Sequence, residues 1–186
     1  MTENSKIWKD LLPTDPKYVR RIPARPGMPA NTFSAIDPTW RMMRLTEYFG
    51  PIGEGWGVAE DPKTTIVDAG EATLIFMHVK CFWRHPDTRE IHYIWGFGGD
   101  SVTKKRAGEG ARGDDEALKK CFTDALMNAY MRLGLSADIW LNLHADSKYI
   151  ANVREFFENT RAIQQQLDEK EPPKPELKPD QPKTFK

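Results

Sequence analysis

The chain has few of the residues that hold secreted or metal-stabilised proteins together. Its 186 residues include only two cysteines and four histidines. Cys81 and Cys121 fall on a predicted strand and a predicted helix face, which favours two core thiols in a reducing compartment. The four histidines lack the spacing of a ligand set, so the sequence predicts no metal site.

Charge excess and long apolar runs are missing as well. The 27 basic residues balance 27 acidic ones, which excludes binding of nucleic acid over the whole surface and leaves only a local basic patch. No run of 18 apolar residues exists, and the N-terminal MTENSKIWKD lacks the apolar core of a signal peptide. We therefore expect a cytoplasmic protein with no membrane partner.

The composition suits one globular domain with a tail. Hydrophobic residues make up 39% of the chain and charged residues 29%, which is enough to bury a core. Residues 170–186, KEPPKPELKPDQPKTFK, contain five prolines and almost no packing residues. We expect a single domain over residues 1–168 and a disordered Pro/Lys-rich tail over residues 169–186.

Helical periodicity is strongest in residues 114–134, where an apolar stripe follows three acidic residues and ends before Gly134. A second helix is bounded by Asp37-Pro38 and Gly50-Pro51, and a third begins after Asp146 and ends near Asp168. The apolar residues expected on the buried face of the second helix are Met42, Met43, Leu45, Thr46 and Phe49.

A short amphipathic helix is expected within residues 1–13. Such a helix is marginal alone, so Trp8, Leu11 and Leu12 must pack either on their own domain or on a neighbouring subunit. Thr14-Asp15-Pro16 starts a further helical turn, and the prolines at positions 23, 26 and 29 then break regular structure.

The middle of the chain alternates as in a β-meander. Residues 55–60, 64–68, 71–83 and 90–97 are rich in β-branched and aromatic residues and are separated by turn signals. The predicted fold class is therefore α+β: an antiparallel β-meander of three to four strands packed on the long helix, with flanking helices and the disordered tail.

Three alternating aromatic residues, Tyr93, Trp95 and Phe97, have two interpretations. They either belong to the core or stack on the bases of a nucleic acid.

No catalytic constellation is recognisable. A nucleophile, a base and an orienting group are not found together, and Gly96-Phe97-Gly98-Gly99 lacks the Lys-Ser/Thr of a phosphate-binding P-loop. The sequence predicts no catalytic residue, no cofactor and no enzyme.

The segment from Lys104 to Arg112 is more informative, because four basic residues and one acid give +3 over nine residues with glycines between them. It is either a solvated turn or a loop that approaches a phosphate chain.

Three segments together resemble the Rad-fifty-two superfamily of single-strand annealing proteins, which includes the eukaryotic recombination mediator and its phage and bacterial relatives. The first segment is IDPTWRMMRLTEYFGPIGEGWG and the second is WGFGG with its basic loop. The third is DDEALKKCFTDALMNAYMRLGLSADIWL, with Lys120 three residues before Thr123-Asp124. The similarity covers roughly residues 14–150, and the chain length is typical of a phage or prophage member.

The resemblance implies a ring or helical homo-oligomer that holds single-stranded DNA in a basic groove and pairs it with its complement. It departs from the superfamily where a Lys/Arg cluster is expected one turn after Thr123-Asp124, since only Arg132 is basic there. We therefore expect the DNA-binding residues to be Lys104, Lys105, Arg106, Arg112, Lys119 and Lys120, with Arg41 and Arg44 across the groove. A competing basic patch is formed by Lys17, Arg20, Arg21 and Arg25.

The predicted function is single-strand annealing in recombination and repair, without covalent chemistry. The expected partners are single-stranded DNA, further copies of the chain and a host single-strand binding protein that contacts the tail. Two alternatives stay open: an RNA-binding or scaffold oligomer on the same fold, and an enzyme with an unrecognised site.

Overall fold

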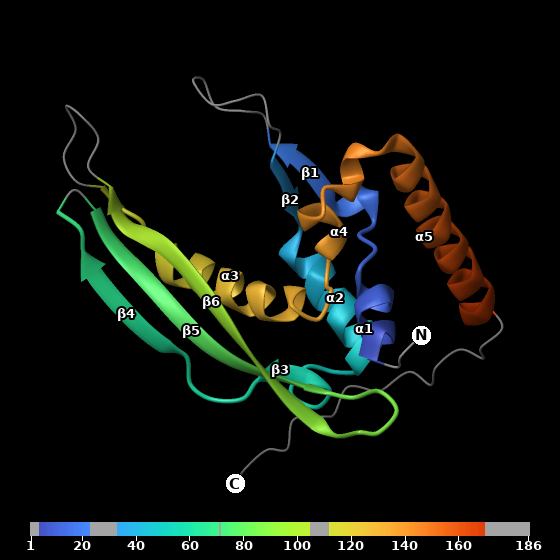
Figure 1. Cartoon of the computed structure of the whole chain (residues 1–186), viewed down its shortest axis with the longest axis horizontal. Coiled ribbons are helices and arrows are strands. Elements are labelled where there is room, and N and C mark those ends of the chain that lie inside the picture. The colour runs from blue at the N-terminus through green and yellow to red at the C-terminus, as the bar shows by residue number, and fades with distance from the viewer. Residues whose placement is uncertain (1–3, 23–32, 71, 105–111, 170–186) are drawn as a thin grey trace, which may run out of the picture.

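An antiparallel sheet and a helix that crosses one of its faces form the centre of the structure (Figure 1). The computed structural model describes residues 4–22, 33–70, 72–104 and 112–169. Within these residues the sheet has five strands: β3 (Trp56–Val58), β4 (Lys63–Asp68), β5 (Ala72–Arg84), β6 (Ile91–Lys104) and β7 (Arg112–Gly113). Both β3 and β4 pair with one edge of β5, while β6 pairs with the other edge and carries β7 at its end.

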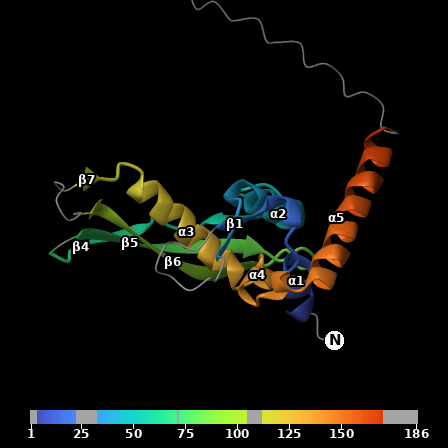
Figure 2. The same ribbon diagram turned by 90° about the horizontal axis from the view of Figure 1, so that it is seen from above.

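The helices lie on one side of this sheet and at one end of it (Figures 1 and 2). They are α1 (Asn4–Leu11), α2 (Pro38–Phe49), α3 (Ala117–Met131), α4 (Ala137–Trp140) and α5 (Ser147–Asp168). Two single-turn helices, η1 (Pro16–Tyr18) and η2 (Leu143–Ala145), join them. The predicted α+β class is confirmed, with the meander β4-β5-β6 packed against helices.

The core lies between the sheet and α3. Alternate residues of β5, from Ile75 to Cys81, are buried on the face that α3 covers, as their period of two predicts. Opposite them on β6 stand Gly96 and Gly98. A Cβ atom at these positions would lie 1.9 Å from the carbonyl oxygen of Ala125 and 2.2 Å from that of Cys121, respectively. The helix backbone therefore rests directly on the strand.

The helix caps follow the sequence signals. Asp37 accepts from the Thr39 N–H at 2.8 Å, with Pro38 in the first turn of α2, and Asp146 caps α5 in the same way. In α3 the acidic residues lie just before the helix instead of in its first turn, because α3 begins only at Ala117. The α2 face also differs from expectation: Trp40 is buried, whereas Met43 and Thr46 are exposed.

Three further features depart from the sequence prediction. β1 (Val19–Ile22) and β2 (Phe33–Ile36) form a two-stranded ribbon next to the proline-rich segment, which lies outside the described residues. β6 extends to Lys104, well beyond the expected end at Phe97. Leu118, one of the apolar residues of the predicted helix over residues 114–134, is exposed.

The N-terminal helix packs within its own subunit. Ile7 and Leu11 are buried in the main core, and the Ser136 N–H donates to the Leu11 carbonyl at 3.1 Å. Trp8 remains partly exposed, and its backbone contacts Gly134, whose φ of 102° is in the left-handed region. Of the two packing alternatives for this helix, the intramolecular one accounts for Ile7 and Leu11.

A buried carboxylate joins the N-terminal segment to the C-terminal helices. Asp138 is fully buried and accepts from the Thr14 N–H at 2.8 Å, the Thr14 hydroxyl at 2.5 Å and the Tyr149 hydroxyl at 3.0 Å. His144 Nε2 lies 3.0 Å from the same carboxylate. Burial alone would raise the pKa of Asp138, but the hydrogen bonds from His144 and Thr14 outweigh burial and lower it.

The contact between α3 and β6 predicts a strong effect of one added methyl group. We expect Gly98→Ala to lower the free energy of unfolding by about 3 kcal/mol, because the Cβ would overlap the α3 backbone. Gly113→Ala is the matched control, since no atom lies within 4 Å of its Cβ position. Urea denaturation of both variants measures the difference. Equal stability of the two would contradict the close approach described above.

The Asp138 cluster predicts a pH dependence of stability. Because the folded-state pKa of Asp138 is below its unfolded value, its contribution is complete above about pH 4 and is lost as the pH falls through the folded pKa. We expect Asp138→Asn to cost about 2 kcal/mol at pH 7 and to flatten the acid limb of the stability profile. Denaturation at pH 7 and below pH 4 tests both effects, and an unchanged acid limb would exclude Asp138 as its source.

Candidate nucleic-acid interface

A groove of about 360 Å³ lies between α2 and α3. It brings together cations from helices that are far apart in the sequence: Arg41 from α2, and Lys119 and Lys120 from α3. The remaining lining residues are Pro38, Glu116, Thr123, Asp124 and Met127. Three of the eight predicted primary DNA-binding residues therefore lie in one groove.

Arg41 is the most constrained of these cations. It is half-buried in the first turn of α2, a position fixed by the Asp37 cap and by Trp40 in the core beside it. Its Nε atom is buried and has no hydrogen-bond partner among the described residues. Burial lowers the pKa of the guanidinium, while the nearby Asp124 opposes that change. The residue also lines the groove, and the planar set of donors of a guanidinium suits a phosphate bound there.

The two lysines are already engaged with carboxylates. Lys120 Nζ lies 2.8 Å from Asp114 Oδ2 and 3.9 Å from a Glu116 oxygen, and the hydrogen bond to Asp114 raises the pKa of Lys120. Lys119 Nζ lies 3.4 Å from Glu116. These pairs are exposed, so each is weak and open to exchange for another anion.

The groove is only moderately basic as a result. Three cations face two carboxylates in its lining, which leaves a net charge of +1. Partial burial raises the pKa of Asp124, although the Gly99 N–H and Arg41 favour its charged form. Each phosphate that binds here must compete with Glu116 for Lys119, and with Asp114 and Glu116 for Lys120.

The predicted basic loop is anchored beside the start of α3. Its first and last residues, Lys104 and Arg112, pair across β6 and β7, and the Asp114 N–H donates to the Val102 carbonyl at 2.7 Å. β7 thus leads directly into α3, the helix that carries Lys119 and Lys120. Lys105 and Arg106 lie outside the described residues.

Arg44 does not lie in the groove with Arg41. Its guanidinium contacts Glu47 at 2.8 Å, the Asp10 carbonyl at 3.1 Å and the face of the Phe157 ring at 5.7 Å. These contacts join α2 to α1 and α5, so Arg44 has a packing role that its sequence position did not reveal.

The competing basic patch lies on a separate part of the structure. Lys17 belongs to η1, while Arg20 and Arg21 are exposed on β1, where neighbouring residues point to opposite faces of the ribbon. Arg20 is close enough to Asp37 to lower the pKa of that carboxyl, after the larger effect of the Thr39 N–H. One side of the ribbon therefore lies near the start of α2, and Arg25 lies outside the described residues.

The sheet face opposite α3 carries the three aromatic residues that the sequence assigned either to the core or to a surface that stacks on bases. Tyr93 is 59% exposed, Trp95 42% and Phe97 45%, which is inconsistent with the core interpretation. Lys80 lies among them, with its Nζ 4.8 Å from the Tyr93 ring centre. The alternation of β6 indicated a shared face but could not show whether another element covers it.

The described residues contain no group of three His, Cys, Asp or Glu side chains that could hold a metal ion. None of the helices in the described ranges is sufficiently long and apolar to cross a membrane. Comparison with protein-family models and with curated protein sequences finds no match for this chain. The resemblance to the annealing superfamily therefore stays a prediction, and the function is argued from the site itself.

Proposed function

We propose that this chain is a single-stranded DNA-binding protein that anneals complementary strands, acting as a homo-oligomer without covalent chemistry. The observation that carries the proposal is the meeting of Arg41 with Lys119 and Lys120 in the groove between α2 and α3. Single-strand binding depends largely on neutralised phosphates, and this groove offers a planar guanidinium and two mobile ammonium groups.

The residues that carry the family resemblance support the same location. Lys120, Thr123 and Asp124 belong to the third matching segment, and all three line the groove. Arg41 belongs to the first matching segment. Two matching segments that are distant in the sequence thus contribute to one surface.

The ion pairs of the groove define how binding would work. A phosphate that reaches Lys119 and Lys120 replaces the Glu116 carboxylate and, at Lys120, the Asp114 carboxylate, so binding is an exchange of partners. Such exchange favours moderate affinity for each site and release of the product duplex. Many weak sites along an oligomer then hold a strand by their combined effect.

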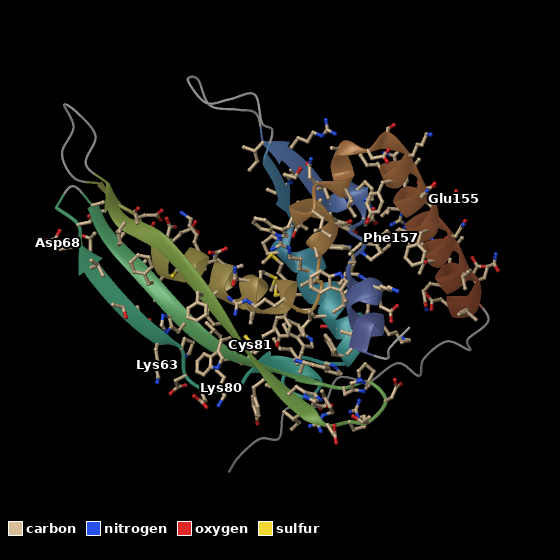
Figure 3. The ribbon with its side chains drawn as sticks, in the orientation of Figure 1. Lys63, Asp68, Lys80, Cys81, Glu155 and Phe157 are labelled. Atoms are coloured by element: carbon tan, nitrogen blue, oxygen red, sulfur yellow. The ribbon has the colours of Figure 1, made fainter. Side chains whose placement is uncertain are left out.

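The exposed part of α5 supports self-association. The helix packs on the rest of the protein through Val153 and Phe157. In Figure 3 the side chain of Phe157 points toward the other helices, whereas that of Glu155 points away from them. Every residue of the helix beyond Phe157 is exposed, and so is Phe156. Three of these exposed residues, Phe156, Ile163 and Leu167, nevertheless form an apolar stripe along the helix. A second copy of the chain is the partner proposed for this stripe.

The remaining parts of the proposal concern the cellular setting. The protein would act on DNA in the cytoplasm of a bacterial or phage-infected cell. The Pro/Lys-rich segment after Asp168, most of which lies outside the described residues, would contact a host single-strand binding protein.

The groove predicts a charge-specific effect on DNA binding. The triple variant Arg41→Gln, Lys119→Ala, Lys120→Ala should weaken binding to all sequences alike and flatten the log–log salt dependence by about 2, or about 0.7 for each phosphate contact. Glu116→Gln should have the opposite effect, because it removes the carboxylate that pairs with Lys119 and one of the two that pair with Lys120. Fluorescence anisotropy with labelled DNA and RNA oligonucleotides at several salt concentrations measures both changes.

A second triple variant, Lys17→Ala, Arg20→Ala, Arg21→Ala, removes the same charge from the ribbon and is the matched control. If this control loses binding while the groove variant keeps it, the ribbon is the DNA surface. Annealing is measured with complementary labelled strands and no nucleotide. Pairing no faster than that of naked DNA would reject the proposed function, and preference for RNA strands would favour the RNA-binding alternative.

The α5 stripe predicts the residues needed for assembly. Ile163→Glu should shift the protein toward monomer in light scattering without lowering its melting temperature, because Ile163 is exposed within the subunit. Gln165→Glu introduces the same charge on the opposite side of the helix and should leave the mass unchanged. A wild-type protein that is monomeric with and without DNA would contradict the proposed assembly.

A further inference from the structure

We propose that the sheet face opposite α3 is a stacking platform for the bases of single-stranded DNA. The platform comprises Phe76, His78 and Lys80 on β5, and Tyr93, Trp95 and Phe97 on β6. The inference rests on the proposed function and deepens it, because it adds a surface that recognises bases to a groove that recognises phosphates.

Strand pairing places these six side chains on one face. His78 pairs with Phe97, and Lys80 pairs with Trp95, in the register of β5 and β6. The buried residues between them, such as Val79 and Gly96, point toward α3, so the platform residues point away from it. Figure 3 shows the same division, with Lys80 and Lys63 projecting from the side of the sheet away from α3.

The platform is too apolar to be an ordinary solvated surface. Its aromatic side chains are between 42% and 59% exposed, and the described helices all lie elsewhere (Figure 2). Phe76 packs over Gly99, since a Cβ on that glycine would lie 3.0 Å from the ring. A contiguous exposed apolar patch of this kind is typical of a binding surface.

Charge indicates a polyanion as the occupant. Lys80 Nζ lies 4.8 Å from the Tyr93 ring centre and 5.8 Å from that of Trp95. Arg132, which reaches round the edge of β6 to donate to the Trp95 carbonyl at 2.9 Å, lies 5.6 Å from the Phe97 ring centre. Of the outward positions on β4, β5 and β6 from Lys63 to Gly99, none is acidic. One carboxylate, Glu60, reaches the rim from outside these strands and pairs with Lys80.

The spacing of the rings suits unpaired bases. Alternate residues of a strand are about 6.8 Å apart, so Tyr93, Trp95 and Phe97 form a row whose repeat allows one base to be held between or over successive rings. Stacking of this kind is tolerant of sequence, which an annealing protein needs. The cations beside the rings can then contact the phosphates that flank each stacked base.

The platform and the groove lie on opposite sides of the sheet, with α3 between them. They would therefore hold different segments of one strand or two different strands. An aromatic ring of the platform takes the place of a neighbouring base in the stack, which interrupts the base stacking of a continuous duplex and favours unpaired strands. The platform would thus hold bases unpaired before they meet a complement, while the groove binds the phosphates of the DNA backbone.

The test compares a thymidine oligonucleotide with an abasic oligonucleotide of the same length. Both carry the same phosphates, and only the first carries bases. We expect wild-type protein to bind the thymidine oligonucleotide at least tenfold more tightly, and the double variant Tyr93→Ala, Trp95→Ala to lose this preference while its affinity for the abasic strand stays unchanged. The conservative Trp95→Phe should retain most of the preference.

The matched control is Val67→Ala with Ile91→Ala. Both residues are exposed apolar side chains on outward positions of the same sheet face, but neither can stack on a base. This control should keep the preference for bases. Melting temperatures of both double variants close to that of wild type establish that each is folded.

The outcomes separate the platform from the groove. If the aromatic variant keeps its preference for bases, the platform is overturned and the groove proposal stands. If it instead changes only the oligomeric mass in light scattering, the face is an interface between copies, which also overturns the platform. Wild-type protein that binds neither oligonucleotide overturns the proposed function and, with it, this inference.

Discussion

The arrangement of the molecule depends on the direct contact between the α3 backbone and the glycines of β6. Gly96 and Gly98 allow the helix to lie closer to the strand than any side chain would permit. This approach buries the small residues Cys121, Ala125 and Ala129 against the sheet. It also fixes the rotation of α3, so that Lys119 and Lys120 line the groove with Arg41. The same contact commits one sheet face to the core and leaves the other face uncovered.

Charge is arranged locally in a chain whose net charge is zero. The cations of the groove are paired with Asp114 and Glu116, and Lys80 on the opposite face is paired with Glu60. Exposed pairs of this kind contribute little to stability, so their loss on binding has little effect on the fold. Arg41 differs, because its buried Nε has no hydrogen-bond partner within the described part of the chain. The two surfaces therefore combine exchangeable ammonium groups with fixed features, a guanidinium on one side and aromatic rings on the other.

Sequence-based prediction was most successful where the hydrophobic periodicity of an element is clear, above all where a helix-capping residue stands beside it. The helices that begin after Asp37 and Asp146, and the alternation of β5, follow from local chemistry alone. The ribbon of β1 and β2 was missed because its strands are separated by the proline-rich segment, and pairing across such a gap has no local signal. Arg44 and Arg41 are both basic residues of α2, and the packing of α1 and α5 against Arg44 distinguishes their roles. Likewise, alternation grouped Tyr93 with Phe97 but could not show which side α3 covers.

The bond between Thr14 and Asp138 also sets an order of events during folding. Its partners are 124 residues apart, whereas the strands of the meander are joined by short turns. Loop closure makes the meander the faster part to form, and on the ribosome it is complete in sequence before Asp138 is synthesised. The N-terminal helix precedes the meander in the chain yet completes its packing late, because Ile7 and Leu11 share a core with Leu135 and the Leu11 carbonyl accepts from the Ser136 N–H. Until the chain beyond Gly134 is made, the apolar side of α1 therefore lacks part of its final cover.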